Sequence, residues 1–280
     1  MRVMADAHAK KHDYHLVNPS PWPFVGSVSA FIMAVGVVFW LHEEIGPYLA
    51  VAGLLGILFT MFGWWRDVVS ESRGGDHTPV VNIHLRYGIA LFIASEALFF
   101  VAWFWAYFDA SLFPGDMQQY LRVEHTGGVW PPEGIQTFNP WHLPLINTVI
   151  LLLSGVTVTW AHHAVMHNDR KGLIMGLALT VGLGAVFSVF QGIEYAEATF
   201  AFSENIYGAT FYMATGFHGF HVIVGTLFLL VCLIRANQGD FTAEKHNGLE
   251  AAAWYWHFVD VVWLFLFAAI YVWGAGTNTH

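Results

Sequence analysis

The sequence has few charged residues. Only 11% of its 280 residues are Asp, Glu, Lys or Arg, whereas 56% are hydrophobic and 17% are aromatic. A soluble globular domain carries about 25% charged residues, so this composition is not that of an ordinary soluble domain. The basic residues form no stripe or patch, and the formal net charge is −9, which excludes a nucleic-acid-binding surface.

Cysteine is almost absent as well. The single residue, Cys232, lies inside an apolar run, which excludes an internal disulfide framework and any metal cluster built on cysteines.

The first 20 residues contain no apolar core and no small-residue cleavage pattern. We therefore expect no cleaved secretory signal at this end.

What the sequence does contain is a series of long apolar runs. Each reaches the roughly 20 residues that a bilayer-spanning helix needs, and each has an aromatic residue near at least one end. They predict an all-α polytopic membrane protein with seven transmembrane helices, at Trp22–Leu41, Pro47–Trp65, Leu85–Phe108, Trp141–Ala161, Leu173–Ala196, Ile206–Ile234 and Leu249–Gly274.

The basic residues predict the orientation of these helices. With seven spans, ten of the eleven Lys and Arg residues fall on the side of the N-terminus, and only Arg122 falls on the other side. Because basic residues are retained on the cytoplasmic side, we expect a cytoplasmic N-terminus and an external C-terminus. The one long loop, 109–140, is then external. It is rich in Pro, Gly and aromatic residues, which favours an ordered cap on the bundle.

Glu96 lies about 15 Å into the third span, counted from the start of its apolar run, and therefore near the middle of a bilayer core about 30 Å thick. An ionised carboxylate at that depth costs several kcal/mol unless it is paired, and its own helix offers no cation. We expect it to be protonated and to face a protein partner through an aromatic surface that includes Phe92, Phe99 and Trp103. Such residues are functional by default, and the alternative is a hydrogen bond that locks two helices.

The 16 histidines raise the question of a metal or haem site. Two clusters stand out, His162, His163 and His167 in one, and His218 and His221 in the other. The clusters lie at different membrane levels, and no third cluster completes a di-iron site. No two of the mid-membrane histidines are spaced to hold a haem between them. We expect no metal ligands in this chain.

Other polar residues in the spans have structural interpretations. His257 and Asp260 are separated by three residues and share a helix face, as a structural pair or, alternatively, as part of a proton relay. Glu194 is placed at the external end of its span, where exposure to water is cheap. Glu250 is placed at a helix N-terminus, which suits a carboxylate.

Several long segments of the sequence resemble a known protein family. They are GWWRDVVSE at 63–71, DHTPVV at 76–81, LRYGIALFIASEALFF at 85–100, GGVWPPEGI at 127–135, NPWHLPLINTVILLLSGVTVTWAHHA at 139–164, FYMATGFHGFHVIVGTLFL at 211–229 and EAAAWYWHFVDVVWLFLF at 250–267. Together with HDYHLVNPSPWPF at 12–24, they resemble subunit III of the aa3-type cytochrome c oxidases, most closely in its bacterial form. The resemblance extends to Trp273.

This resemblance implies an architecture and a set of partners. The helices would form a two-plus-five, V-shaped arrangement, with a tail and two-helix hairpin at 1–66 and a five-helix bundle at 67–280. The chain itself would bind phospholipid but no redox cofactor. Haem a, haem a3, CuA and CuB would belong to subunits I and II. A small subunit IV, cytochrome c and a bc1 complex would be further partners.

The resemblance also implies roles for single residues. Glu96 matches the carbodiimide-reactive buried carboxylate of the family. The positions that match its lipid cleft are Trp65, Glu71, His77 and Arg235. After Arg235 the segment reads ANQGDF (236–241), without the further basic residues of the animal members.

The expected function is therefore that of a non-redox oxidase subunit, which stabilises subunit I, holds phospholipids and supports proton uptake. The histidines at His8, His12 and His15 can collect protons at the cytoplasmic surface, or they can belong to a solvated tail without a role. A stand-alone transporter driven by Glu96 and a metal-dependent membrane oxygenase are the rival classes, although no internal repeat supports the transporter. The expected location is the bacterial plasma membrane, with the mitochondrial inner membrane as the alternative.

Overall fold

The computed structural model describes residues 12–276 and is predominantly helical. Seven of its helices are long and apolar enough to cross a membrane, which confirms the predicted all-α class and the seven spans. These are α1 (Trp22–Leu41), α2 (Tyr48–Gly74), α3 (Pro79–Leu112), α5 (Leu143–Met166), α6 (Arg170–Glu197), α7 (Ile206–Gln238) and α8 (Asn247–Leu266), the last extended by the π-helical segment η2 (Phe267–Trp273).

Helices α2 and α3 extend furthest beyond the apolar runs that predicted them. Helix α2 continues past Trp65 to Gly74, where Gly75 takes a left-handed conformation with φ of 87° and ends the helix. Helix α3 begins at Pro79 rather than Leu85, since proline suits the first turn of a helix and the Thr78 hydroxyl accepts a hydrogen bond from the Val81 amide at 3.3 Å. Hydropathy marks only the apolar part of a helix, so it missed both extensions.

The chain forms two compact units, one up to Leu85 and one from Arg86 onward. In the first unit, α1 and α2 make an antiparallel hairpin whose backbones approach closely at glycines. A Cβ on Gly36 would clash with the backbone nitrogen of Ala50, and a Cβ on Gly53 would clash with that of Met33. Small residues at such crossings let membrane helices pack by van der Waals contact.

The hairpin also contains a polar contact near the start of α1. The Trp22 indole donates a hydrogen bond to the Asp67 carboxylate of α2 at 2.6 Å. Gly63, one turn earlier on α2, leaves space for the Trp22 ring, since a Cβ there would clash with it. The two helices of the first unit are therefore joined along their length by close backbone approach and at one end by this hydrogen bond.

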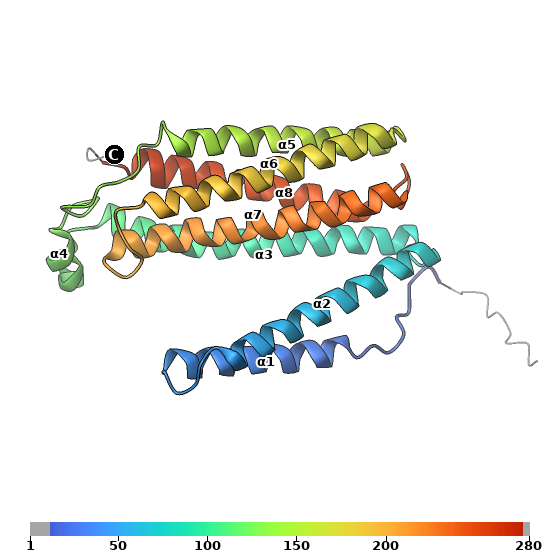
Figure 1. The fold of residues 1–280 in the computed structure, drawn as a ribbon, viewed down its shortest axis with the longest axis horizontal. Coiled ribbons are helices and arrows are strands. Elements are labelled where there is room, and N and C mark those ends of the chain that lie inside the picture. Colours follow the sequence, from blue (N-terminus) through green and yellow to red (C-terminus); the bar gives the residue numbers. More distant parts are fainter. Residues whose placement is uncertain (1–11, 277–280) are drawn as a thin grey trace, which may run out of the picture. The chain divides into compact units, whose positions relative to one another are not determined.

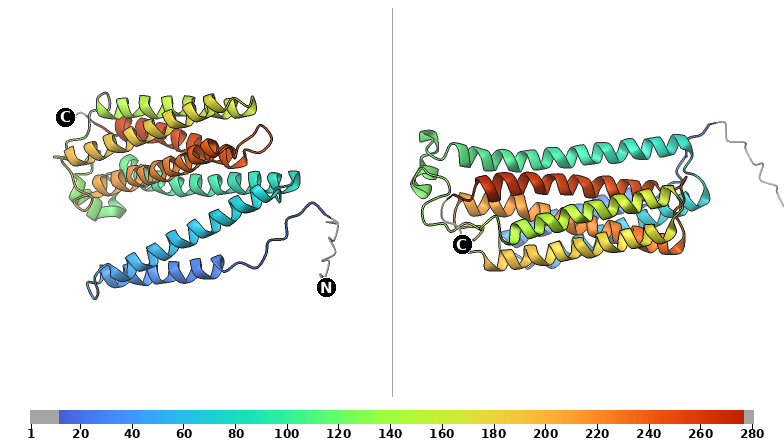
Figure 2. Two further views of the ribbon diagram at one scale, coloured as in Figure 1. Left: turned by 45° about the vertical axis from the view of Figure 1, so that its right-hand side comes forward. Right: turned by 90° about the horizontal axis from the view of Figure 1, so that it is seen from above.

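In the second unit, α5, α6, α7 and α8 form a closed ring in which each helix packs on the next (Figures 1 and 2). Helix α3 lies against α7 and α8. Its Phe99 ring meets Phe217 at 4.8 Å between centroids, and the Tyr107 hydroxyl donates to the Ala269 carbonyl at 3.0 Å. The ring of four helices and α3 together enclose the core of this unit.

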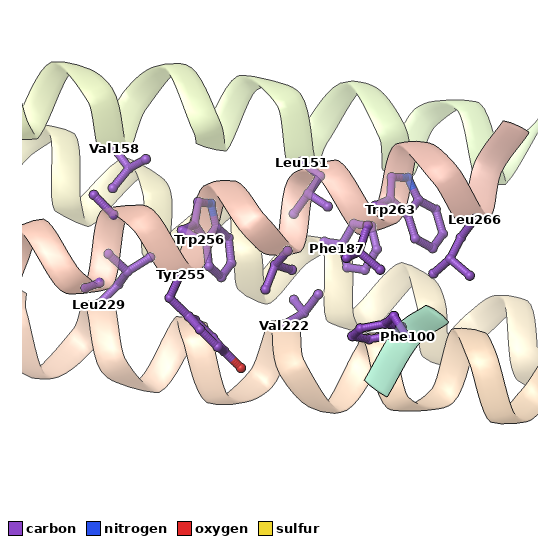
Figure 3. Packing of buried hydrophobic residues seen from close by; sticks show 14 of the residues in the cluster. Phe100, Leu151, Val158, Phe187, Val222, Leu229, Tyr255, Trp256, Trp263 and Leu266 are labelled. Carbon is purple, nitrogen blue, oxygen red and sulfur yellow. The ribbon is translucent and has the colours of Figure 1, made fainter. Parts of the chain in front are cut away.

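Two buried tryptophans of α8 fill the centre of the ring (Figure 3). The Trp256 indole donates to the Ser154 hydroxyl at 2.8 Å, and the Trp263 indole donates to the Thr148 hydroxyl at 2.9 Å. Gly225 makes room for the Trp256 ring, because a Cβ there would lie 2.8 Å from its Cε3 atom. Each indole N–H is thus satisfied inside an apolar core.

The loop at 109–140 is ordered and contains the short helices η1 (Met117–Gln119) and α4 (Tyr120–Thr126), which hydropathy did not predict. Its aromatic residues pack on the second unit. Trp130 lies 5.5 Å from Tyr107 and 5.4 Å from Tyr207 between ring centroids, and Phe138 lies 5.7 Å from Phe200. The loop therefore covers one end of the helix ring.

Candidate functional site

The carboxylate of Glu96 lies near the middle of α3 and is paired within the chain. Its Oε2 atom is 2.9 Å from Nε2 of His221 on α7, and the Glu96 side chain is 24% exposed. The other ring nitrogen of His221, Nδ1, lies 2.7 Å from the Phe217 carbonyl. A carbonyl can only accept, so Nδ1 carries a proton and donates it.

The proton on Nδ1 of His221 restricts the Glu96–His221 pair to two protonation states. Since Nδ1 of His221 is a donor, Nε2 needs a second proton to bond the carboxylate, or Glu96 must supply it. The contact is therefore either a carboxylic acid donating to a neutral imidazole or an imidazolium donating to a carboxylate. Both forms have zero net charge, which avoids the cost of an isolated charge in the bilayer.

This partner differs from the expected one. Glu96 was expected to meet another protein, across an interface made by the aromatic face of α3. In the structure, Phe99 and Trp103 pack on Phe217 of the same chain, with ring centroids 4.8 and 5.4 Å apart. That face of α3 is used internally, because α7 supplies both the aromatic ring and the histidine.

The candidate lipid-binding residues belong to both units. Trp65 and Glu71 lie on α2 and His77 in the turn that follows it, all in the first unit. Arg235 lies near the end of α7 in the second unit. Its Nε donates to the Asp240 carboxylate at 3.1 Å, and its guanidinium lies 4.7 Å from the centre of the Phe241 ring.

Of the candidate proton-collecting histidines, His8 lies outside the described residues. His15 sits between two carboxylates, with Nε2 3.6 Å from Glu71 and Nδ1 3.8 Å from Asp76. The His12 ring lies 5.8 Å from that of Tyr14, which stacks on His84 at 6.0 Å. The segment before α1 is thus held against the α2–α3 turn.

His257 and Asp260 share a face of α8, with Nδ1 3.8 Å from Oδ2. Nε2 of His257 is 3.1 Å from the Thr159 hydroxyl of α5. Gly155 of α5 leaves space for the carboxylate, since a Cβ there would clash with Asp260 Oδ2. The two residues therefore occupy the contact between α5 and α8.

The histidine clusters do not converge. His218 bonds the Val259 carbonyl at 3.2 Å through Nε2, and His167 bonds the His163 carbonyl at 2.9 Å through Nδ1. Across residues 12–276, no group of three or more His, Cys, Asp or Glu side chains is arranged to hold a metal ion.

Glu194 departs most from its expected environment. It was expected at an exposed position, but its side chain is buried and the residue is only 1% exposed. It accepts hydrogen bonds from Tyr271 at 2.5 Å and from Gln191 at 3.1 Å. The spacing of Gln191 and Glu194 puts both on one helix face, but no feature of the sequence showed that this face is internal.

Glu250, expected at a helix N-terminus, lies in the first turn of α8. It also accepts a hydrogen bond from Nε of Arg86 at 2.8 Å, which ties the start of α8 to α3. No local pattern indicated this partner, which is 164 residues away.

Comparison with known proteins identifies the family. A family model described as cytochrome c oxidase subunit III matches residues 12–275. The chain belongs to this family. Cytochrome c oxidase subunit 3 of Arabidopsis thaliana is 55% identical over 268 residues, which cover 95% of this chain and 98% of the relative. The proteins of the same name from Prototheca wickerhamii and Osphranter robustus are 53% and 51% identical over 267 and 265 residues, covering 95% and 94% of this chain and 99% and 98% of theirs.

The chain is thus a multi-pass membrane subunit of cytochrome c oxidase in the aerobic respiratory chain, and other oxidase subunits are its partners. This membership replaces the rival classes of transporter and oxygenase.

Proposed function

We propose that this chain is the non-redox subunit that stabilises subunit I of the oxidase, retains structural phospholipids and supports proton uptake. The observation that carries the first role is an exposed apolar stripe on α3. Leu91, Leu98 and Trp105 recur every seven residues and so share one helix face. Leu98 is 70% exposed and Trp105 is 76% exposed.

This stripe suits a protein partner because a large aromatic side chain there can anchor an interface. The opposite side of α3, with Glu96 and Phe99, is already occupied by α7. Within the second unit, helix α3 therefore has one face packed on α7 and one face that no other helix of that unit covers, and we assign the latter to subunit I. The haem and copper centres would belong to subunits I and II.

Copurification tests this assignment. The complex is isolated in mild detergent with wild-type chain, Trp105→Ala, or Val156→Ala, which alters an exposed residue of α5. Truncation of an anchor costs about 2 kcal/mol or more of binding free energy, so we expect Trp105→Ala to lower the ratio of this chain to the haem-containing subunits several-fold. Val156→Ala should leave that ratio unchanged. An unchanged ratio for Trp105→Ala would assign the stripe to lipid.

We propose that Arg235 binds a phospholipid phosphate at the cytoplasmic surface, and that Trp65, Glu71 and His77 of the first unit also contact lipid. An Arg–phosphate contact is a strong, charge-assisted hydrogen bond. We expect Arg235→Ala to lower the phospholipid content of the purified complex. Asp240→Asn is the matched control, because it removes the carboxylate that Arg235 bonds at 3.1 Å but keeps the cation. Equal phospholipid loss in both variants would mean that Arg235 acts only through the fold of its turn.

For proton uptake, we propose that the histidines before α1 exchange protons with the cytoplasm. Imidazoles titrate near neutral pH, and His15 lies beside two carboxylates that can pass a proton on. We expect replacement of His8, His12 and His15 together by Gln to slow steady-state turnover selectively at alkaline pH, where protons are scarce. A pH–rate profile that matches the wild type would leave the segment with a structural role.

We also propose that the N-terminus is cytoplasmic, because ten of the eleven basic residues fall on that side. We propose that the chain resides in a bacterial plasma membrane, with the mitochondrial inner membrane as the alternative. Cell fractionation of the source organism distinguishes the two locations.

A further inference from the structure

The buried carboxyl of Glu194, in the last turn of α6, has an uneven set of partners. Both hydrogen bonds that it receives arrive at one atom, Oε1. The Tyr271 hydroxyl of η2 donates to it at 2.5 Å, and Nε2 of Gln191, one helical turn earlier, donates at 3.1 Å. Since the residue is 1% exposed, water at the protein surface does not reach the carboxyl group.

Two neighbouring oxygens remain unsatisfied within residues 12–276. Glu194 Oε2 and Gln191 Oε1 are buried and have no hydrogen-bond partner. As ordinarily protonated, both are acceptors, so they cannot bond each other. Buried polar atoms in native proteins nearly always have a hydrogen-bond partner. Two unpaired acceptor oxygens on side chains that already contact each other therefore indicate a proton between them.

The surroundings disfavour a charged carboxylate. The ion pairs of the described residues include no cation beside Glu194. The titratable groups near Glu194 are four tyrosines and one glutamate, none of which carries a positive charge. They are Tyr195, Tyr207, Tyr212, Tyr271 and Glu197. Taking an unpaired carboxylate out of water carries a large penalty, which the neutral acid avoids.

We propose that Glu194 holds a proton on Oε2 at neutral pH and donates it to Oε1 of Gln191. The acid and the amide then form two hydrogen bonds in opposite directions, and the Tyr271 hydroxyl donates to the remaining lone pair of Oε1. A single proton satisfies both oxygens and removes the charge. The second unit thus contains a proton-binding site that is separate from the Glu96–His221 pair, which lies between α3 and α7.

Infrared spectroscopy of the intact oxidase complex tests the proposal. We expect the wild-type complex at neutral pH to show a carboxylic-acid C=O stretching band that is lost in Glu194→Gln. The matched control is Glu197→Gln, which alters an exposed carboxylate one turn away on the same helix and should keep the band. If Glu194→Gln instead removed only carboxylate absorption, the proposal would be overturned.

A second variant keeps the test valid if Glu194→Gln does not assemble. Tyr271→Phe removes the donor to Oε1 and leaves the acid in place. We expect the same C=O band to move to higher frequency, because the carbonyl oxygen loses its shorter hydrogen bond. An unchanged acid region in the Tyr271→Phe spectrum would overturn the assignment of the proton to Glu194.

Discussion

Replacement of Trp256 by alanine is expected to lower the stability of the second unit more than the replacement of any residue at its surface. Trp256 is fully buried at the centre of the α5–α8 ring, where Gly184 and Gly225 leave space for its indole. Removal of the ring opens a cavity and leaves the Ser154 hydroxyl without its partner. Such truncations cost about 3–5 kcal/mol. The measurement is the yield of this subunit in the complex and the temperature at which it dissociates.

Trp254→Ala provides the control on the same helix. Its side chain is at the surface of the second unit, with 36% exposure, so its removal opens no internal cavity. We expect the dissociation temperature to stay close to that of the wild type. Equal losses in the two variants would show that helix length and hydrophobicity, rather than packing inside the ring, stabilise this unit.

Replacement of His221, the partner of Glu96, is expected to cause the second-largest loss of stability. His221→Leu leaves the carboxyl of Glu96 without its partner in an aromatic environment, which costs about 1–3 kcal/mol. Glu96→Gln should be well tolerated, since the amide can donate to Nε2 of His221 and keeps the shape. We expect oxygen consumption and proton pumping to continue in Glu96→Gln.

A double-mutant cycle separates the pair from its surroundings. The His221→Leu/Glu96→Leu variant should lose less stability than the two single leucine variants summed, because no polar partner is then left alone. Strict additivity in the thermal dissociation of the complex would contradict a direct interaction. Loss of proton pumping in an intact Glu96→Gln complex would instead make Glu96 a proton relay.

The parts of the fold that could be predicted from the sequence are those that depend on the bilayer. A helix that crosses a membrane must be long and apolar, so seven apolar runs correspond to seven helices, and the first, Trp22–Leu41, matched to the residue. The polar ends of α2 and α3 were missed because hydropathy falls there while the helix continues. Helix α4 was missed because it lies outside any apolar run.

The candidate site was less accessible to prediction, because its contacts join residues far apart in the sequence. Glu96 was identified from the cost of a carboxylate in an apolar run, but His221 is 125 residues away and nothing local marks it as the partner. Glu194 was misjudged because the external end of a span was equated with exposure. In the structure η2 covers that end, and Tyr271 comes from it.

The close contact between α1 and α2 affects how such chains can change during evolution. The hairpin is held by backbone contacts at Gly36 and Gly53 and by the Trp22–Asp67 hydrogen bond, all of which are internal to the first unit. Among the described residues, no residue before Phe100 belongs to the buried cluster around Trp256. The two parts thus have separate stabilising contacts, so mutations can accumulate in one without compensating changes in the core of the other. Gene variants that shorten, replace or delete the hairpin should yield a second unit that still folds around its own tryptophans.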